Sequence, residues 1–289
     1  MTSHFSCDGL PDLRYHQARM RSERVFTNLT CNQNCTTCTD RRSVEAPGFV
    51  RPAAVRARID AAAATGAAEL VLTGGEPTLR RDLVELVAHA RGLGVEVGLE
   101  TNATTLDATR AAELAAAGLS RARVNLSGWG AAQDAMTRDP GGAARTVEGL
   151  TALLDAGVAV DVVALVVRST VGALAALPAR LAELARPSGA AVSTLVLRVP
   201  VSSAEPTELL PYDVAARAIA GVEAAARKVG VAVKLAPDSG PPPCVFEHPG
   251  RVAHLYSMTP GAQARADHRR VPACDACQMQ DRCSGFAVA

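Results

Sequence analysis

The chain has 289 residues, a formal net charge of +1 and a hydrophobic content of 48%, and aromatic residues make up only 3%. This length accommodates one large α/β domain with a small appendage. No apolar segment is long enough to cross a bilayer, the N-terminal residues lack the apolar core of a signal peptide, and no cluster of basic residues marks a nucleic-acid surface. We therefore expect a cytoplasmic protein that binds neither nucleic acid nor a membrane.

Short β-rich segments alternate with alanine-rich helical segments between residues 24 and 235. The predicted strands cover residues 24–30, 69–73, 95–101, 121–127, 158–167 and 191–199. Helices are predicted between them, beginning at Pro52, near Leu83 and after Asp107, and covering residues 142–156, 172–185 and 212–229. Strands separated by helices of this length form parallel βαβ units. Six units are too few for an eight-fold barrel, so the sheet either closes partially or lies open, with functional residues at the carboxyl ends of its strands.

Three cysteines, Cys31, Cys35 and Cys38, follow the first predicted strand directly. Their spacing lets one short loop surround a single metal centre with three thiolates. A closed zinc site or an ordinary electron-transfer cluster requires four protein ligands. The loop therefore either leaves one coordination position open for chemistry or takes a fourth ligand from elsewhere in the chain.

Gly74, Gly75, Glu76 and Pro77 follow the second predicted strand. A glycine-rich turn between a strand and a helix explains the two glycines, because glycine adopts backbone conformations that other residues avoid. It does not explain a glutamate at the same edge of the sheet as the cysteines. A carboxylate in this position is suited to holding an ammonium group.

Together the two motifs resemble the signature of the radical S-adenosylmethionine (SAM) superfamily. The resemblance extends over residues 24 to about 200. It implies a partial (β/α)6 barrel of the TIM type, in which the three cysteines of the loop bind a 4Fe–4S cluster with one open iron. It also implies that the glycine-rich motif, through Glu76, binds the amino group of SAM, which completes the coordination. One departure exists, because the family usually has an aromatic residue before the third cysteine and this chain has Thr37.

Later segments resemble further strand ends of the same family. Thr101 and Asn102 resemble its third-strand segment, and Ser127 lies in a segment similar to its fourth-strand motif, from which a serine often contacts SAM. A plain strand end is the alternative interpretation of Ser127. Arg168 and Arg198 end the fifth and sixth predicted strands, where each faces either the cofactor site or solvent.

Four further cysteines, Cys244, Cys274, Cys277 and Cys283, lie in the last sixth of the chain, after a proline-rich segment that cannot form a regular element. Zinc bound by four thiolates is one interpretation. A resemblance to SPASM and twitch subdomains implies an auxiliary 4Fe–4S cluster instead, and the low cysteine count indicates a single cluster. The use of Cys244 as a ligand departs from the SPASM order, so the site has either three or four protein ligands.

These patterns predict three regions: an N-terminal extension over residues 1–23, the barrel over 24–235, and a cysteine-rich subdomain over 236–289. Cys7 is interpreted as a free thiol. No histidine spacing indicates a metal site.

The resemblance implies reductive cleavage of SAM to methionine and a 5′-deoxyadenosyl radical, which abstracts a hydrogen from the substrate. An auxiliary cluster favours a net oxidation. The favoured substrate is a side chain of a ribosomally synthesised peptide, modified by cross-linking, thioether formation or epimerisation. The alternative substrate is a small-molecule alcohol such as an aminocyclitol.

An electron donor such as flavodoxin or ferredoxin is implied as a partner. A peptide substrate would also require a separate leader-peptide-binding protein or recognition by an exposed edge strand. A non-catalytic scaffold that holds two zinc ions and binds a partner is the hypothesis from a different class.

Overall fold

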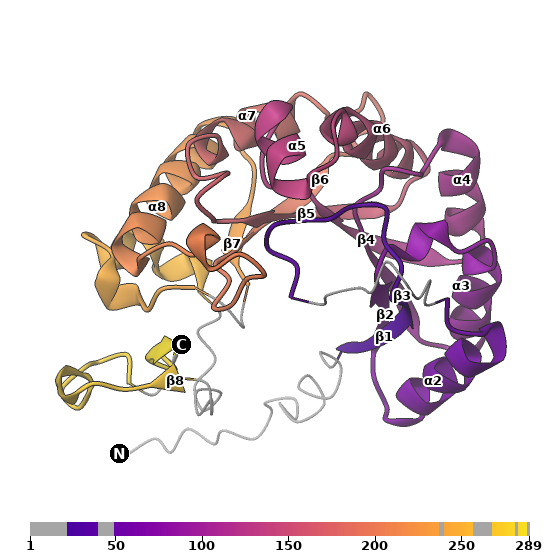
Figure 1. Ribbon diagram of the computed structural model, residues 1–289, viewed down its shortest axis with the longest axis horizontal. Coiled ribbons are helices and arrows are strands. Elements are labelled where there is room, and N and C mark those ends of the chain that lie inside the picture. The colour runs from indigo at the N-terminus through magenta and orange to yellow at the C-terminus, as the bar shows by residue number, and fades with distance from the viewer. Residues whose placement is uncertain (1–21, 40–48, 237–239, 257–267, 281–282, 288–289) are drawn as a thin grey trace, which may run out of the picture.

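The computed structural model describes residues 22–39, 49–236, 240–256, 268–280 and 283–287. Seven parallel strands form one sheet, in which each strand pairs with the next along the chain. They are β1 (Ser22–Asn28), β2 (Glu69–Gly74), β3 (Glu96–Thr101), β4 (Leu119–Asn125), β5 (Ala159–Leu165), β6 (Val192–Arg198) and β7 (Val233–Leu235). Figure 1 shows that the sheet curves into an incomplete barrel with β1 and β7 at its two ends. The predicted α/β partial barrel is confirmed.

Helices connect the strands and cover the convex face of the sheet (Figure 1). They are α2 (Pro52–Ala64), α3 (Leu83–Gly92), α4 (Ala108–Ala116), α5 (Ala131–Thr137), α6 (Gly142–Asp155), α7 (Leu177–Ala182) and α8 (Tyr212–Val229). The local sequence explains where α4 begins. The side chain of Asp107 accepts a hydrogen bond from the Arg110 amide and caps the N-terminus of the helix. None of the helices in the described part of the chain is long and apolar enough to span a membrane.

Three elements differ from the sequence-based expectation. The structure adds a seventh strand, β7, and the short helix α5. The helix predicted over 172–185 is shorter, because a 3-10 turn, η2 (Leu174–Ala176), precedes α7. Pro178 lies in the first turn of α7, and proline is tolerated there but not in a helix interior, so the helix begins at this point.

The hydrophobic core lies between the sheet and the helices, because successive strand residues point to opposite faces. On β6, Leu195 and Leu197 are fully buried in this core, whereas Val196 and Arg198 line a cavity on the concave face. The concave side is thereby left open to hold a ligand.

Ion pairs cross the concave face. Arg123 Nη2 lies 2.8 Å from Glu69 Oε2, although their strands, β4 and β2, are separated by β3. The carboxylate passes over β3 at Gly98, where an added Cβ would lie only 2.8 Å from Glu69 Oε1. The absence of a side chain at this position therefore makes room for the ion pair. Two further pairs on this face are Arg24 with Glu100 and Arg121 with Asp161.

The described residues after β7 form only short elements. They are η4 (Pro243–Val245), α9 (Pro249–Val252), η5 (Ala253–Leu255), β8 (His268–Arg269), η6 (Pro272–Cys274) and β9 (Phe286–Ala287). β8 and β9 pair antiparallel in a sheet of their own.

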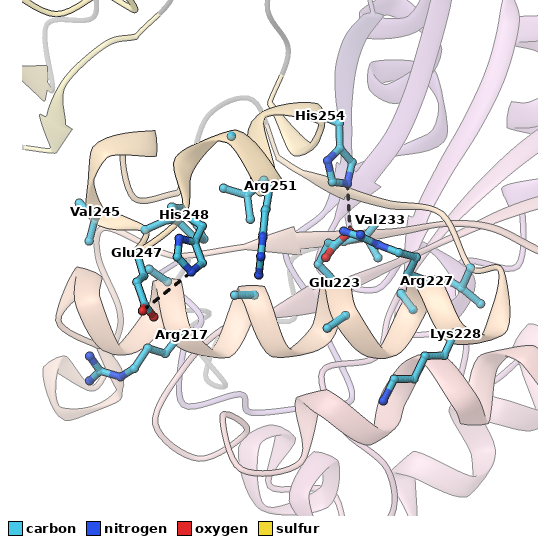
Figure 2. Close-up of a pocket in the computed structure, with 18 of the residues that line it drawn as sticks. Arg217, Glu223, Arg227, Lys228, Val233, Val245, Glu247, His248, Arg251 and His254 are labelled. Atoms are coloured by element: carbon cyan, nitrogen blue, oxygen red, sulfur yellow. Dashed lines mark hydrogen bonds and ion pairs between the residues drawn. The ribbon is translucent and has the colours of Figure 1, made fainter.

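An outer groove of about 1250 Å³ lies between α8 and the segment 245–254 (Figure 2). Within it, Oε1 of Glu223 on α8 accepts hydrogen bonds from Arg227 Nε at 3.1 Å and Nη2 at 2.5 Å, and lies 3.3 Å from His254 Nε2. The groove lies on the convex side of β7, whose Val233 lines it.

Candidate cofactor and metal site

The segment 31–38, the cysteine loop, runs from β1 toward α5 (Figure 1). Thr36 attaches it on two sides. Its amide donates to the carbonyl oxygen of Met136 in α5 at 2.9 Å, and its carbonyl oxygen accepts from the Glu205 amide at 3.0 Å and the Ser203 hydroxyl at 3.1 Å. The loop is therefore fixed to segments that follow β4 and β6, across the barrel from β1.

Arg80 joins the residues that precede and follow the cysteine loop. Its side chain is buried, and Nη1 donates to the carbonyl oxygen of Thr27 at 2.9 Å and to that of Val50 at 2.8 Å. Nε and Nη2 donate to the two carboxylate oxygens of Asp82, at 2.9 and 2.7 Å. A single guanidinium thus clamps both stems of the loop.

One backbone amide within the cysteine loop donates to a sulfur atom, and another closes a turn of the loop. The Gln33 amide donates to Cys31 Sγ at 3.4 Å, and the Cys38 amide donates to the Cys35 carbonyl oxygen at 3.2 Å. Amide-to-sulfur hydrogen bonds stabilise negative charge on a thiolate, and they tune the metal centre that the thiolate binds. This local geometry is suited to metal-bound cysteines.

The two glycines after β2 permit close contact with the stem of the cysteine loop. The Gly75 amide donates to the Asn28 carbonyl oxygen at 2.8 Å, and a Cβ on Gly75 would lie 1.8 Å from Thr30 O. Gly74 has a φ of +133°, which side chains rarely tolerate. The packing of this turn therefore explains why both positions are glycine. It does not explain why a glutamate follows them.

Glu76 is only 1% exposed, and its carboxylate accepts four hydrogen bonds. Oε1 accepts from Thr78 N at 3.0 Å, from Thr78 Oγ1 at 2.6 Å and from Thr101 Oγ1 at 2.6 Å, while Oε2 accepts from Asn102 N at 2.7 Å. Burial raises the pKa of this carboxyl, although the hydrogen bonds act in the opposite direction. Among the described residues, no basic side chain forms an ion pair with Glu76. The group is therefore suited to a cation from outside the chain.

One cavity of about 780 Å³ brings most of the predicted residues together at the carboxyl ends of the strands. It is lined by Cys31, Cys35, Cys38, Gly74, Gly75, Glu76, Thr101, Asn102, Ser127 and Arg198. Residues from β1 to β6 thus meet at one place, as expected for the rim of a parallel barrel.

Two predicted residues do not line this cavity. Pro77 is buried at the start of the 3-10 turn η1 (Pro77–Leu79), directly after Glu76. Arg168 is exposed, and its Nε donates to the Thr207 carbonyl oxygen at 2.7 Å. The reason is that β5 ends at Leu165, two residues before the predicted end, so Arg168 lies in the turn beyond the rim.

Ser127 and Thr37 lie on the wall next to α5. Ser127 Oγ accepts a hydrogen bond from the Leu165 amide at 2.9 Å, and a hydroxyl that accepts one bond still has its hydrogen to donate. Thr37 lines the cavity together with Met136, and its Oγ1 lies 3.8 Å from Met136 Sδ. Methionine thereby contributes an apolar, polarizable surface where the aromatic residue of the resembled family is absent.

Several basic residues of the concave face were not predicted from the sequence. Arg24, Arg123 and Lys234 also line the cavity. The period of two along each strand was an available signal, because Arg123 lies four residues before Ser127 and therefore on the same face. Lys234 had no such signal, since β7 was not predicted as a strand.

The four C-terminal cysteines line a second, apolar cavity of about 190 Å³, and they are Cys244, Cys274, Cys277 and Cys283. The pKa of the Cys244 thiol is raised, first by burial and then by the nearby sulfur atoms of the other three. Amides donate to sulfur here too, from Met279 to Cys277 at 3.4 Å and from Gly285 to Cys283 at 3.3 Å. The structure therefore brings the four together. Cys7 lies outside the described residues.

The thiol groups at both cysteine sites are soft ligands of the kind that bind an iron–sulfur cluster or zinc. In a 4Fe–4S cluster each thiolate binds a different iron, so the sulfur atoms surround the cluster and do not meet at one point. A set of thiolates supported by amide-to-sulfur bonds therefore fits iron and sulfide, and the buried Glu76 fits an amino group beside them.

Residues 26–172 match the protein family described as the Radical SAM superfamily. The chain is 36% identical over 103 residues to a probable GTP 3',8-cyclase from Pyrococcus abyssi, an alignment that covers 36% of this chain and 33% of that protein. It is 31% identical over 131 residues to an AdoMet-dependent heme synthase from Oleidesulfovibrio alaskensis, covering 45% of this chain and 34% of the relative. The alignments thus span about a third of the length of these relatives.

Among solved structures, the chain is similar to Streptococcus suis SuiB bound to its precursor peptide SuiA. The TM-score is 0.62, the sequence identity is 13%, and the match covers 78% of this chain and 51% of SuiB. A similarity at this identity concerns the fold.

Proposed function

The chain belongs to the radical SAM superfamily, and we propose on this basis that it binds a 4Fe–4S cluster and SAM at the cysteine loop and cleaves SAM reductively. The observation that carries the proposal is a buried carboxylate, Glu76, that lines the same cavity as three cysteines. When bound, the cluster and SAM supply a 5′-deoxyadenosyl radical that abstracts a hydrogen from the substrate.

Each residue of the cavity has a role in this proposal. Cys31, Cys35 and Cys38 would hold three irons and leave the fourth for SAM. Glu76 would bind the SAM ammonium, because it is the buried carboxylate at that wall. The hydrogen bonds from Thr101 and Asn102 to Glu76 hold this carboxylate in one orientation.

Other cavity residues would position the remainder of SAM. Ser127 would donate its hydroxyl hydrogen to the ribose or the carboxylate of SAM. Because position 37 is a threonine and not an aromatic residue, Met136 would pack against the adenine. Arg168 has no part in the proposal, because its side chain is directed to the segment after β6.

We assign an auxiliary 4Fe–4S cluster to the cysteine-rich region over 236–289, beside a barrel over 24–235 and an extension over 1–23. The second cavity, lined by four thiols, supports this assignment and supports Cys244 as the fourth ligand. A second cluster would provide an acceptor for the electron left on a substrate radical, which favours net oxidation.

For the substrate, a side chain of a ribosomally made peptide is the first candidate, with cross-linking, thioether formation or epimerisation as the outcome. The similarity in fold to SuiB, which was solved with its precursor peptide, supports it. A separate leader-peptide-binding protein and an electron donor such as flavodoxin or ferredoxin would be its partners.

A small molecule is the second candidate, for example an alcohol on an aminocyclitol. The relatives described as GTP 3',8-cyclase and heme synthase, which are more similar in sequence than SuiB, favour it. Substrate-dependent formation of 5′-deoxyadenosine, measured with a peptide set and separately with a sugar and cyclitol set, distinguishes the two candidates.

Anaerobic reconstitution with iron and sulfide, followed by SAM and a strong reductant, tests the core of the proposal. We expect a broad absorbance band at about 400 nm, about eight irons per chain and formation of 5′-deoxyadenosine. Cys35→Ala should abolish 5′-deoxyadenosine. A protein that binds zinc, remains colourless and forms none after full reconstitution would be the non-catalytic scaffold instead.

A further inference from the structure

A closed ring of side-chain hydrogen bonds joins the cysteine loop to the turn after β3. Asn102 Nδ2 donates to Asn32 Oδ1 at 2.9 Å, and Asn32 Nδ2 donates to Thr104 Oγ1 at 2.7 Å. Thr104 Oγ1 donates to Asn102 Oδ1 at 2.8 Å and closes the ring. All three bonds run in the same direction, so each group polarises the next. The ring therefore holds Asn32, which follows Cys31 directly, against the end of β3.

The orientation of the Asn102 amide follows from its neighbours. The Thr104 amide, which can only donate, lies 3.0 Å from Asn102 Oδ1, so this oxygen faces Thr104. Both hydrogens of Nδ2 therefore face the cysteine loop. One is used in the ring, and the other is directed to Cys31 Sγ, which lies 3.9 Å from Nδ2. Because Asn102 is only 5% exposed, water competes little for this hydrogen.

The backbone of the same turn is held in an unfavourable conformation. Ala103 is fully buried and has a φ of +59°, in the left-handed region that favours glycine. Its amide donates to Thr101 Oγ1 at 2.8 Å, and Thr146 Oγ1 donates to the Asn102 carbonyl oxygen at 2.9 Å. Backbone strain of this kind persists only where the surroundings fix it, and it is concentrated at functional sites. The turn is thus fixed in the conformation that presents the Asn102 side chain to the loop.

Asn102 also contacts the residue that the proposed function assigns to the ammonium of SAM. Its backbone amide donates to Glu76 Oε2 at 2.7 Å. The backbone of Asn102 therefore serves the SAM side of the cavity, whereas its side chain serves a sulfur atom on the cluster side. A substitution at this position changes the second contact and retains the first.

We propose that Asn102 is a positioning residue for the metal centre: its side chain donates to the Cys31 sulfur and raises the reduction potential of the cluster bound there, while Asn32 and Thr104 hold the amide in place. This inference rests on the proposed function, because it requires a cluster at the cysteine loop. Reduction adds a negative charge to a cluster, and a hydrogen bond to a thiolate ligand stabilises that charge. Asn102 would thereby make it easier for an electron to enter the site at which SAM is cleaved.

A redox titration followed by electron paramagnetic resonance tests the proposal on the reconstituted full chain. The signal of the loop cluster is the one that Cys35→Ala lacks. Asn102→Leu keeps the size of the side chain and removes both donor hydrogens. At the potential that half-reduces the parent cluster, we expect the ratio of reduced to oxidised cluster to fall about tenfold, which corresponds to about 59 mV for one electron. Thr104→Val breaks the ring but leaves Asn102 in place, so the ratio should fall by only about threefold.

The cysteine loop offers a matched control, because Asn32 and Asn34 are both exposed and lie two residues apart. Asn32→Ala should lower the ratio about threefold, and Asn34→Ala should leave it unchanged, because only Asn32 belongs to the ring. SAM affinity supplies a second readout. In Asn102→Leu it should stay within about twofold of the parent value, since the backbone donor to Glu76 is retained. A purely structural role would lower the affinity together with the potential.

Three results would overturn the inference: an unchanged potential in Asn102→Leu, equal shifts in Asn32→Ala and Asn34→Ala, or a loss of SAM affinity as large as the fall in the ratio. If Asn102→Leu takes up no iron, the comparison of Thr104→Val and Asn32→Ala with Asn34→Ala decides. Formation of 5′-deoxyadenosine by the parent chain with no shift in any variant refutes the role of Asn102 alone. A parent chain that shows neither the loop signal nor 5′-deoxyadenosine refutes the proposed function, and the inference with it.

Discussion

The carboxylate of Glu76 lies buried where β2 and β3 end, and four hydrogen bonds fix its orientation. Burial disfavours the charged form more than these bonds favour it, so the pKa is raised above 4.5. A bound ammonium group would reverse this balance by supplying the missing positive charge. For the cation site that we propose at Glu76, occupancy would therefore depend on the protonation of this carboxyl.

Glu76→Gln should weaken SAM binding about 10- to 100-fold, because a hydrogen bond to a charged group contributes about 1.5–3 kcal/mol. In the parent chain the proton competes with the ammonium. Since the folded-state pKa is raised, SAM affinity should fall as the pH drops toward that pKa, beginning on the neutral side of 4.5. Equilibrium binding of SAM across pH checks both effects.

Glu148→Gln, an exposed change on α6, provides the control and should leave the affinity and its pH profile unaltered. The same pH dependence in Glu76→Gln as in the parent chain would contradict the assignment of the ammonium to Glu76.

At this scale the motifs were sufficient to predict which residues meet. The cysteines and Glu76 line one cavity because parallel strands end at the same rim, a property that spacing and order reveal. Arg168 was misplaced because a shift of two residues at the end of β5 moved it out of the rim. Lys234 was missed because its strand has only three residues, too few to display a period.

At the scale of elements, six of the seven strands and the long helices follow from the alternation of β-rich and alanine-rich segments along the chain. The short elements do not. α5 has only seven residues, and its ends are defined by backbone contacts: Gly130 lies at its start with a positive φ, and the cysteine loop donates to its last turn. Such contacts join segments far apart in sequence, and local propensity carries no information about them.

Arg80 is an element-level feature, because it joins the two stems of the cysteine loop. Arg80→Met should lower the free energy of unfolding by about 3–5 kcal/mol, since it leaves Asp82 and two carbonyl oxygens without their partner. It should also accelerate loss of iron to a chelator. Thermal unfolding and timed iron release check these effects.

Arg81→Met is the matched control, because Arg81 is exposed one residue further along and its change should alter stability by no more than about 0.5 kcal/mol. Equal iron release from Arg80→Met and Arg81→Met would show that the clamp does not support the loop.

For the whole molecule, the important arrangement is that two cysteine sites at opposite ends of the sequence lie in separate cavities. The first belongs to the barrel rim, and the second is built from short elements with little core of their own. Small units of this kind depend on a metal for stability. The number of cysteines in the tail was enough to predict a second site. That all four thiols line one cavity could be seen only in the structure.

The double variant Cys274→Ala/Cys277→Ala should reduce iron from about eight to about four per chain and leave SAM cleavage intact, because the loop site is complete without the tail. Iron analysis and 5′-deoxyadenosine formation check this. Unchanged iron with loss of one zinc would identify the tail as a zinc site. Loss of cleavage as well would make the tail a structural requirement of the barrel.

The glycine at position 98 affects how the strands of the sheet can separate from one another. Because Glu69 reaches across β3 to Arg123, β2 and β4 are joined to each other as well as to the strand between them. Fluctuations that separate β3 from one neighbour must also break this ion pair. The backbone amides of β2, β3 and β4 should therefore exchange with deuterium as one cooperative unit. They should exchange more slowly than the amides of the short edge strand β7.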